Sequence, residues 1–397
     1  MSSRRPARLP RLLCCAWLVA LSAVVAAKSA PEVPPTAIGA DSADIYEDAL
    51  RRLYTGDNAA AVIQFKNVLK ADPNNLPARI ALGRAHLQSG DAIAAEKELR
   101  IALGLGAARD QVFPVLGNAL IAQRKYAEVL DTIKPPMPGS PGSFEIQVLR
   151  GRANFELGKH DDAVAAFEAA RKLKPTSAEP LVGLGLVRHA QSRLDDAVAR
   201  YDEALALVPN DSEAWYRKGE ALRDMGKPDA ASEAFDHALR SAPKSMRVRL
   251  SRGSLRLTQG DVQGALEDVM VVREQKPTDL PSLFLLWQIH ERQQNATAAR
   301  QDLLDLVGRL GQFSESALGT EPLLLRIAAL VRYANRELAR AEELLDRYTK
   351  LRPNDVGMRR LHGQVQLLLG EAKAAIATLH PLYRQDPKNF ETLLALG

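Results

Sequence analysis

Residues 144–177 read FEIQVLRGRANFELGKHDDAVAAFEAARKLKPTS, and residues 212–245 read SEAWYRKGEALRDMGKPDAASEAFDHALRSAPKS. Both stretches are 34 residues long and carry the same residue at twelve positions, six of which mark the repeat. Gly stands at positions 8 and 15, Ala at positions 20 and 27, Phe at position 24 and Pro at position 32. A fixed period that keeps Gly, Ala and Pro in phase predicts a chain of repeated helix–turn–helix units.

The same period continues through most of the chain. Eight units cover residues 42–313 without a change of register, starting at residues 42, 76, 110, 144, 178, 212, 246 and 280. An insertion at 314–321 precedes two more units over 322–389, which start at residues 322 and 356. Position 8 is Gly in seven of the ten units and position 20 is Ala in nine. The pattern resembles the tetratricopeptide repeat (TPR), which implies an all-α superhelical solenoid of antiparallel helix pairs.

Each repeated position has a mechanical reason. Small residues at positions 8 and 20 let the two helices of a unit approach closely, and a large apolar residue at position 24 fills the space between neighbouring units. Pro at position 32 ends the second helix. Gly at position 15 supplies the turn, and a following Asp, as in Gly56-Asp57, caps the second helix.

Two segments depart from the period. The third unit loses its second helix to KPPMPGSPGS, residues 134–143, which predicts a long loop, the alternative being a flexible joint between residues 42–133 and the rest. Residues 390–397 have the pattern of a truncated eleventh unit, with Gly397 at position 8. Because a solenoid normally ends on a unit with a polar outer face, we expect the native chain to be longer.

The N-terminus has the pattern of a secretory signal peptide. Four arginines precede an apolar run, Leu12 to Ala27, that ends in small residues, so residues 1–27 are predicted to be a signal peptide and 28–41 a Pro-rich linker. The alternative is an uncleaved segment that associates the protein with a membrane. Both cysteines, Cys14 and Cys15, lie within this segment. We therefore expect an exported protein of the periplasm or cell envelope of a Gram-negative bacterium.

The charge and the motifs argue against several classes of function. The formal net charge is +5, of which the signal segment contributes four, so the body is nearly neutral and has no footprint for nucleic acid. Gly183-Leu184-Gly185 is explained by the repeat pattern, and the histidines show no metal-ligand spacing. We expect no catalytic residues, no metal and no cofactor.

The resemblance to TPR proteins implies a concave surface that binds protein or peptide ligands. In that family, positions 2, 5, 6, 9, 12 and 13 of each unit face the groove. Here these positions are apolar in the first four units and polar in the sixth and seventh, although many of the side chains could instead pack between helices. The partner-binding candidates are Tyr46, Leu50, Tyr54, Ile80, Leu87, Ile121, Phe155, Tyr216, Arg217, Arg223 and Arg247.

A closer resemblance concerns residues 42–133. The phrases AAEKELRIALGLGA and VFPVLGNALIAQRKYAEVLD resemble the N-terminal part of the TPR lipoproteins of PEP-CTERM (exosortase) systems, although the lipobox cysteine is missing. The resemblance implies a non-enzymatic scaffold linked to exopolysaccharide production or protein sorting. The alternative is the adaptor arm of a larger glycosyl- or sulfotransferase whose catalytic domain lies beyond residue 397.

Overall fold

The computed structural model describes residues 40–135, 142–313, 318 and 321–385. The predicted signal peptide, nearly all of the linker, most of the insertion and the start of an eleventh unit lie outside these residues. Within them the chain forms 20 helices in paired packing. It divides between Ala107 and Ala108 into an N-terminal segment, residues 1–107, and a C-terminal segment, residues 108–397.

The N-terminal segment contains the first two repeat units, in which successive helices pack against one another. Its helices are α1 (Ala40–Thr55), α2 (Asn58–Ala71), α3 (Leu76–Gln88) and α4 (Ala92–Gly104). The first helix begins two residues before the predicted start of the repeats at Ser42. Asp57 and Asp91 follow the predicted turn glycines and cap α2 and α4 by accepting hydrogen bonds from Ala60 N and Ala94 N. The predicted role of Asp after the turn is thus confirmed in both units.

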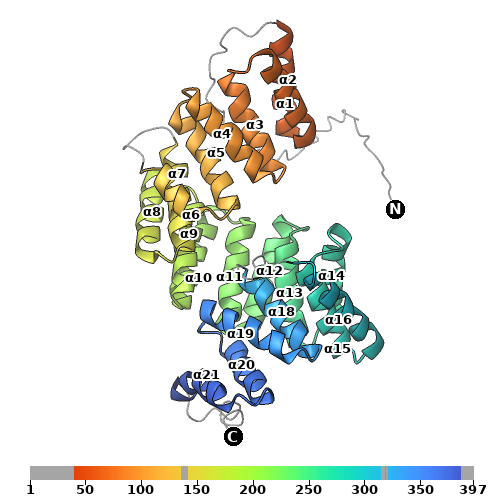
Figure 1. Cartoon of the computed structure of the whole chain (residues 1–397). Coiled ribbons are helices and arrows are strands. Elements are labelled where there is room, and N and C mark those ends of the chain that lie inside the picture. The colour runs from red at the N-terminus through yellow and green to blue at the C-terminus, as the bar shows by residue number, and fades with distance from the viewer. Residues whose placement is uncertain (1–39, 136–141, 314–317, 319–320, 386–397) are drawn as a thin grey trace, which may run out of the picture. The chain divides into compact units, whose positions relative to one another are not determined.

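The C-terminal segment contains the other eight units as consecutive helix pairs (Figure 1). Its helices are α5 (Arg109–Ala122), α6 (Tyr126–Thr132), α7 (Ser143–Glu156), α8 (His160–Leu173), α9 (Glu179–Ala190), α10 (Leu194–Leu207), α11 (Ser212–Asp224), α12 (Pro228–Ser241), α13 (Met246–Gln259), α14 (Val262–Gln275), α15 (Leu280–Arg292), α16 (Ala296–Leu310), α18 (Pro322–Ala334), α19 (Leu338–Leu351), α20 (Val356–Leu368) and α21 (Ala372–Gln385). The second helix of the third unit, α6, has only seven residues, and α7 begins at the last residue of the predicted loop.

The glycines at position 8 lie where two helices touch. A Cβ atom at Gly151 would lie 2.6 Å from Cε1 of Phe167, which occupies position 24 of the same unit. Gly219 has the same relation to Phe235, again at 2.6 Å. Because a real Cβ cannot approach another atom so closely, these positions accept only Gly unless the facing ring moves.

The aromatic residue at position 24 also joins neighbouring units. Gly183, on the first helix of the fifth unit, would place a Cβ 2.5 Å from the ring of Phe167 in the fourth unit. The ring is therefore held between Gly151 and Gly183, and the small residues of Gly183-Leu184-Gly185 serve helix packing. The alanines at position 20 complete this core, because all nine are buried: Ala61, Ala95, Ala163, Ala197, Ala231, Ala265, Ala299, Ala341 and Ala375.

The turn at position 15 has a left-handed backbone in all ten units. Gly occupies it six times, with φ of 69–86°, as at Gly226 and Gly260. The other four units hold the same conformation with a side chain present, at Arg124, Ser192, Gln294 and Arg336, with φ of 57–65°. Left-handed backbone is unfavourable for a residue with a Cβ, so the packing of the helix pair must impose it.

Candidate functional site

The five candidates in the N-terminal segment differ in exposure. Tyr54 is 80% exposed and Leu50 is 39% exposed, both on α1, so their side chains are free to contact a partner. Tyr46 and Leu87 are half-buried, and the ring of Tyr46 packs edge-on against Phe65 with centroids 5.9 Å apart. Ile80 is only 7% exposed and belongs to the core.

The next two candidates lie on α5 and α7 of the C-terminal segment. Ile121 and Phe155 are both half-buried. Phe155 packs against the core cluster that contains Phe167 and Tyr201, and its ring centroid lies 6.1 Å from that of His160. Phe155 therefore contributes to packing and keeps only part of its ring for a partner.

Tyr216 on α11 is buried, and two arginines lie over its ring in cation–π contacts. It is 6% exposed, and the guanidinium of Arg247 lies over its ring at 4.3 Å from the centroid. Arg217 lies 5.3 Å from the same centroid. Burial raises the pKa of the Tyr216 hydroxyl. The ring face is already covered, so a partner would meet the arginines first.

The three candidate arginines are each paired with a carboxylate. Arg217 Nε lies 2.7 Å from Glu213 Oε1, and Arg247 of the next unit pairs with the same Glu213. Arg223 makes two hydrogen bonds of 3.0 Å to Glu220. The polar surface of the sixth and seventh units is thus internally neutralised, and an acidic ligand would have to displace an existing ion pair.

An open groove of about 680 Å³ lies on the first helices of units seven to nine, α13, α15 and α18. These three helices are neighbours in the C-terminal segment. Most of the lining residues stand at positions 5, 9, 12 or 13 of their units, the positions expected to face a concave surface. We call it the Trp287 groove; it is lined by Leu257, Thr258, Phe284, Trp287, Gln288, Glu291, Arg292 and Leu330.

Trp287 breaks the repeat pattern at the point of closest helix approach. It stands at position 8 of the eighth unit, where the nine other units have Gly or Ala. A second hollow of about 510 Å³ is lined by residues of α15 and α16, among them Ala299 and Leu303 of positions 20 and 24. An indole at this position prevents the close helix contact that a glycine permits, and the indole lines the groove.

The indole nitrogen of Trp287 is a second irregularity. Nε1 is shielded from solvent and has no hydrogen-bond partner among the described residues. A buried donor without an acceptor costs roughly 1–3 kcal/mol. Local rules that are broken at a cost to stability are expected at functional positions, and here the costly residue lines a groove.

The sequence contains one feature that indicates this groove, the large residue at position 8 of the eighth unit, but the candidate residues were chosen from other positions. Position 8 is Gly in seven units and Ala in two, at Ala49 and Ala329, which leaves Trp287 as the single large residue. The candidates lie in units one to four, six and seven, and none of them is among the residues that line the groove. The one large residue at position 8, Trp287, indicated the groove better than the apolar or polar character of the whole unit did.

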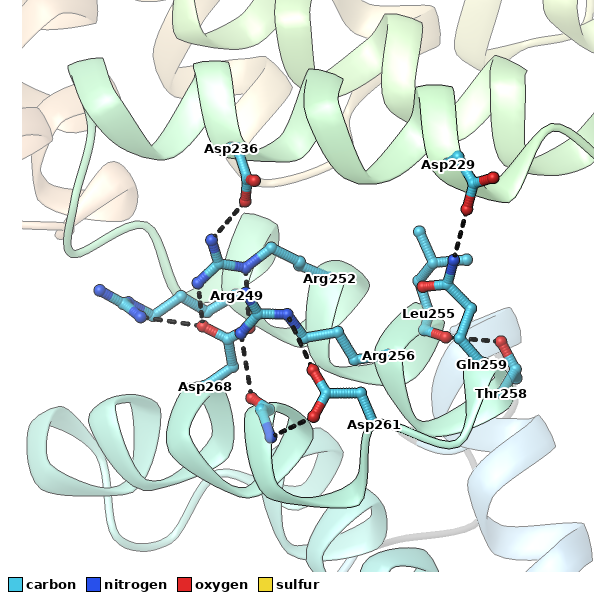
Figure 2. Close-up of polar contacts among 11 residues, drawn as sticks. Asp229, Asp236, Arg249, Arg252, Leu255, Arg256, Thr258, Gln259, Asp261 and Asp268 are labelled. Carbon is cyan, nitrogen blue, oxygen red and sulfur yellow. Dashed lines mark hydrogen bonds and ion pairs between the residues drawn. The ribbon is translucent and has the colours of Figure 1, made fainter.

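Three arginines of α13 are arranged around one buried carboxylate (Figure 2). Asp268 on α14 is fully buried and accepts hydrogen bonds from Arg249 (2.9 Å), Arg252 (2.6 Å) and Arg256 (3.1 Å) of α13. Arg252 also reaches Asp236 on α12 at 2.6 Å. These arginines connect three helices, and their role is structural.

The described residues offer little for other chemistry. They contain no group of three or more His, Cys, Asp or Glu side chains placed to hold a metal ion. Among the same residues, none of the helices combines the length and the apolar character needed to cross a membrane.

Comparison with known proteins identifies the repeat. One tetratricopeptide repeat profile matches residues 115–178, 148–212, 182–224, 216–279 and 328–390, and a second matches residues 52–111. No curated protein matches the chain significantly.

Two solved structures illustrate the architectural likeness. The crystal structure of the APC/C hetero-tetramer Cut9-Hcn1 is 12% identical, with 90% of this chain and 96% of that chain covered at a TM-score of 0.45. A tetratricopeptide repeat protein from Parabacteroides merdae is 15% identical, with 64% and 97% covered at a TM-score of 0.47. Both TM-scores are below 0.5, so neither superposition bears on the function of this chain.

Proposed function

Because the chain belongs to the tetratricopeptide repeat family, we propose that it is a non-enzymatic scaffold that binds protein partners through the Trp287 groove. The observation that carries this proposal is the break in the repeat at Trp287. The indole takes the place of a packing glycine and, with Phe284, forms an apolar floor on helices that otherwise follow the repeat. Aromatic residues that line a groove are typical anchors of protein interfaces.

Binding can be tested by comparing matched variants. Wild-type protein and Trp287→Ala would be immobilised and used to capture partners from an extract of the native host, with Ile376→Ala as the control. Ile376 is exposed on α21, outside the groove, so its loss should leave capture unchanged. We expect Trp287→Ala to lose partners that Ile376→Ala retains. Equal capture by all three proteins, each with the wild-type circular dichroism spectrum, would place the binding surface elsewhere.

We further propose that the protein is exported and acts in a bacterial envelope assembly, such as a PEP-CTERM system for exopolysaccharide production or protein sorting. The support is the signal-peptide pattern of residues 1–27 and the resemblance of residues 42–133 to lipoproteins of such systems. Cell fractionation and N-terminal sequencing test the export. A periplasmic protein that begins near Lys28 supports it, and a cytoplasmic protein that begins at Met1 or Ser2 contradicts it.

A further inference from the structure

We propose that the Trp287 groove binds a short acidic peptide segment that inserts one bulky apolar side chain. This inference rests on the proposed protein-binding function and specifies the chemistry of the partner. It follows from the apolar floor of the groove and from the charges that remain unpaired around it.

The floor of the groove suits an apolar anchor. The rings of Phe284 and Trp287 have centroids 5.5 Å apart at an angle of 49°. Leu257 of α13 and Leu330 of α18 line the groove on either side. A volume of about 680 Å³ admits a large side chain together with adjoining backbone. Burial of a Leu or Phe side chain there supplies the main part of the binding free energy.

The helices that form the groove are strongly basic. Together α13, α15 and α18 contain seven arginines and one acidic residue, Glu291. Five of the arginines are paired with carboxylates that lie outside these three helices. Arg247 pairs with Glu213, Arg332 pairs with Glu337 at 2.8 Å, and Arg249, Arg252 and Arg256 surround Asp268.

Two arginines have no carboxylate partner among the residues that the structure describes. Arg292 lines the groove at the end of α15, and Arg326 lies one turn before Leu330 on the same face of α18. Both are exposed, and neither makes an ion pair within the described part of the chain. Arg292 lines the groove next to Glu291, the one carboxylate of these helices, so Arg326 on the adjoining face of α18 supplies one positive charge that no carboxylate of these helices balances.

Charge complementarity therefore favours carboxylates next to the anchor. An Asp or Glu can pair with Arg292 or Arg326 without breaking an existing ion pair, whereas a basic peptide would find only Glu291. Arginine is also the better donor for carboxylates because its planar guanidinium can form two parallel hydrogen bonds. Two free arginines are too few for tight binding to a nucleic-acid backbone.

Selection from a random peptide library displayed on phage tests this chemistry with the full-length protein. We expect the enriched peptides to share a large apolar residue with Asp or Glu nearby. A fluorescein-labelled copy of the most enriched peptide would then be titrated against wild type, Arg292→Glu, Arg326→Glu and the double variant. Each single reversal should weaken binding roughly threefold and the double variant about tenfold, since exposed ion pairs are individually weak.

The control is Arg240→Glu, which reverses the charge of an exposed residue on α12, the second helix of the sixth unit. It should leave the affinity unchanged, and added salt should weaken the wild-type complex more than that of the double variant. Enrichment of basic or uncharged peptides would overturn the acidic chemistry while leaving the scaffold function intact. Binding of the peptide by the double variant with wild-type affinity would also overturn the acidic chemistry and leave the scaffold function intact. If selection on the wild-type protein enriches no peptide more strongly than selection on Trp287→Ala does, both proposals are contradicted.

Discussion

Four residues in this protein hold a backbone conformation that favours glycine. Arg124, Ser192, Gln294 and Arg336 occupy position 15 with positive φ, where the other units have Gly. Their presence shows that the stacked helices dictate the turn and that the turn residue only adapts to it. The conformational cost remains in the folded state, so each position is a place where stability can be gained.

Ser192→Gly should stabilise the protein by about 0.5–1 kcal/mol, because it relieves left-handed strain that outweighs the added freedom of the unfolded chain. Chemical denaturation of the two proteins measures the difference. The matched reverse change, Gly226→Ser, should destabilise by a similar amount because φ is +69° there. A neutral or destabilising Ser192→Gly would show that the serine turn is unstrained.

The glycines around Phe167 give the opposite expectation. Gly151→Ala and Gly183→Ala should each destabilise by about 1–3 kcal/mol, since the new methyl meets a ring that is itself enclosed. Gly308 on α16 has open space around its Cα, so Gly308→Ala should instead stabilise by about 0.5–1 kcal/mol. Thermal unfolding of the three variants would distinguish contact from helix propensity. Equal effects at all three sites would refute the contact.

At the scale of the element, one buried carboxylate holds a helix pair together. Asp268→Asn should cost about 3–5 kcal/mol, because three arginines around a buried site lose their shared counter-charge. Asp236→Asn removes an exposed partner of Arg252 and should cost at most about 1 kcal/mol. Denaturant titrations of both variants provide the comparison. A small effect at Asp268 would mean that water replaces the carboxylate.

Much of the helix arrangement could be predicted from the sequence because it depends on residue size alone. Gly151, Phe167 and Ala163 lie in the contacts that positions 8, 24 and 20 predicted. Periodicity does not determine which side of a first helix faces solvent and which faces the next unit. For that reason Ile80 and Tyr216, chosen by position, are buried.

The candidate site was less predictable because it depends on pairs and exceptions. Arg217 and Arg223 have carboxylates three or four residues away on the same helix, which the sequence already displays. Arg247 finds Glu213 at a separation of 34 residues, one full repeat, and this pairing requires the stacking of units. The groove at Trp287 could have been predicted only from the exception at position 8, where a large residue replaces the small one that close helix packing needs.

At the scale of the whole molecule, burial shifts the pKa of tyrosines in several units in the same direction. Burial raises the pKa of Tyr46, Tyr201 and Tyr216, and burial with a hydrogen bond to Asp355 raises that of Tyr348 to about 12. A folded pKa above the ordinary value of 10.0 means that these groups stabilise the fold fully below that pH. The contribution of Tyr348 is lost as the pH rises from 10.0 to about 12, and the raised pKa values of the other three tyrosines give the same direction.

We therefore expect cooperative alkaline unfolding in this range, accompanied by a rise in tyrosinate absorbance. Because Lys also loses charge at these pH values, the informative comparison is with the double variant Tyr201→Phe/Tyr348→Phe. Its stability, relative to its own value at neutral pH, should fall less steeply with pH. The hydroxyl of Tyr201 has no hydrogen-bond partner among the residues that the structure describes, so its removal should not weaken the fold at neutral pH. Parallel pH curves for the two proteins would assign the alkaline loss to other groups.

The ring of Phe167 limits how far this protein can be treated as a set of modules. It contacts position 8 of its own unit and position 6 of the next, and position 6 is Gly only at Gly183. At the same position other units carry larger side chains, such as Leu149 and Arg217. Duplicating, deleting or shuffling single repeats at this junction would drive such a side chain into the ring. Chimeric repeat arrays should therefore keep the fourth and fifth repeats together and in this order.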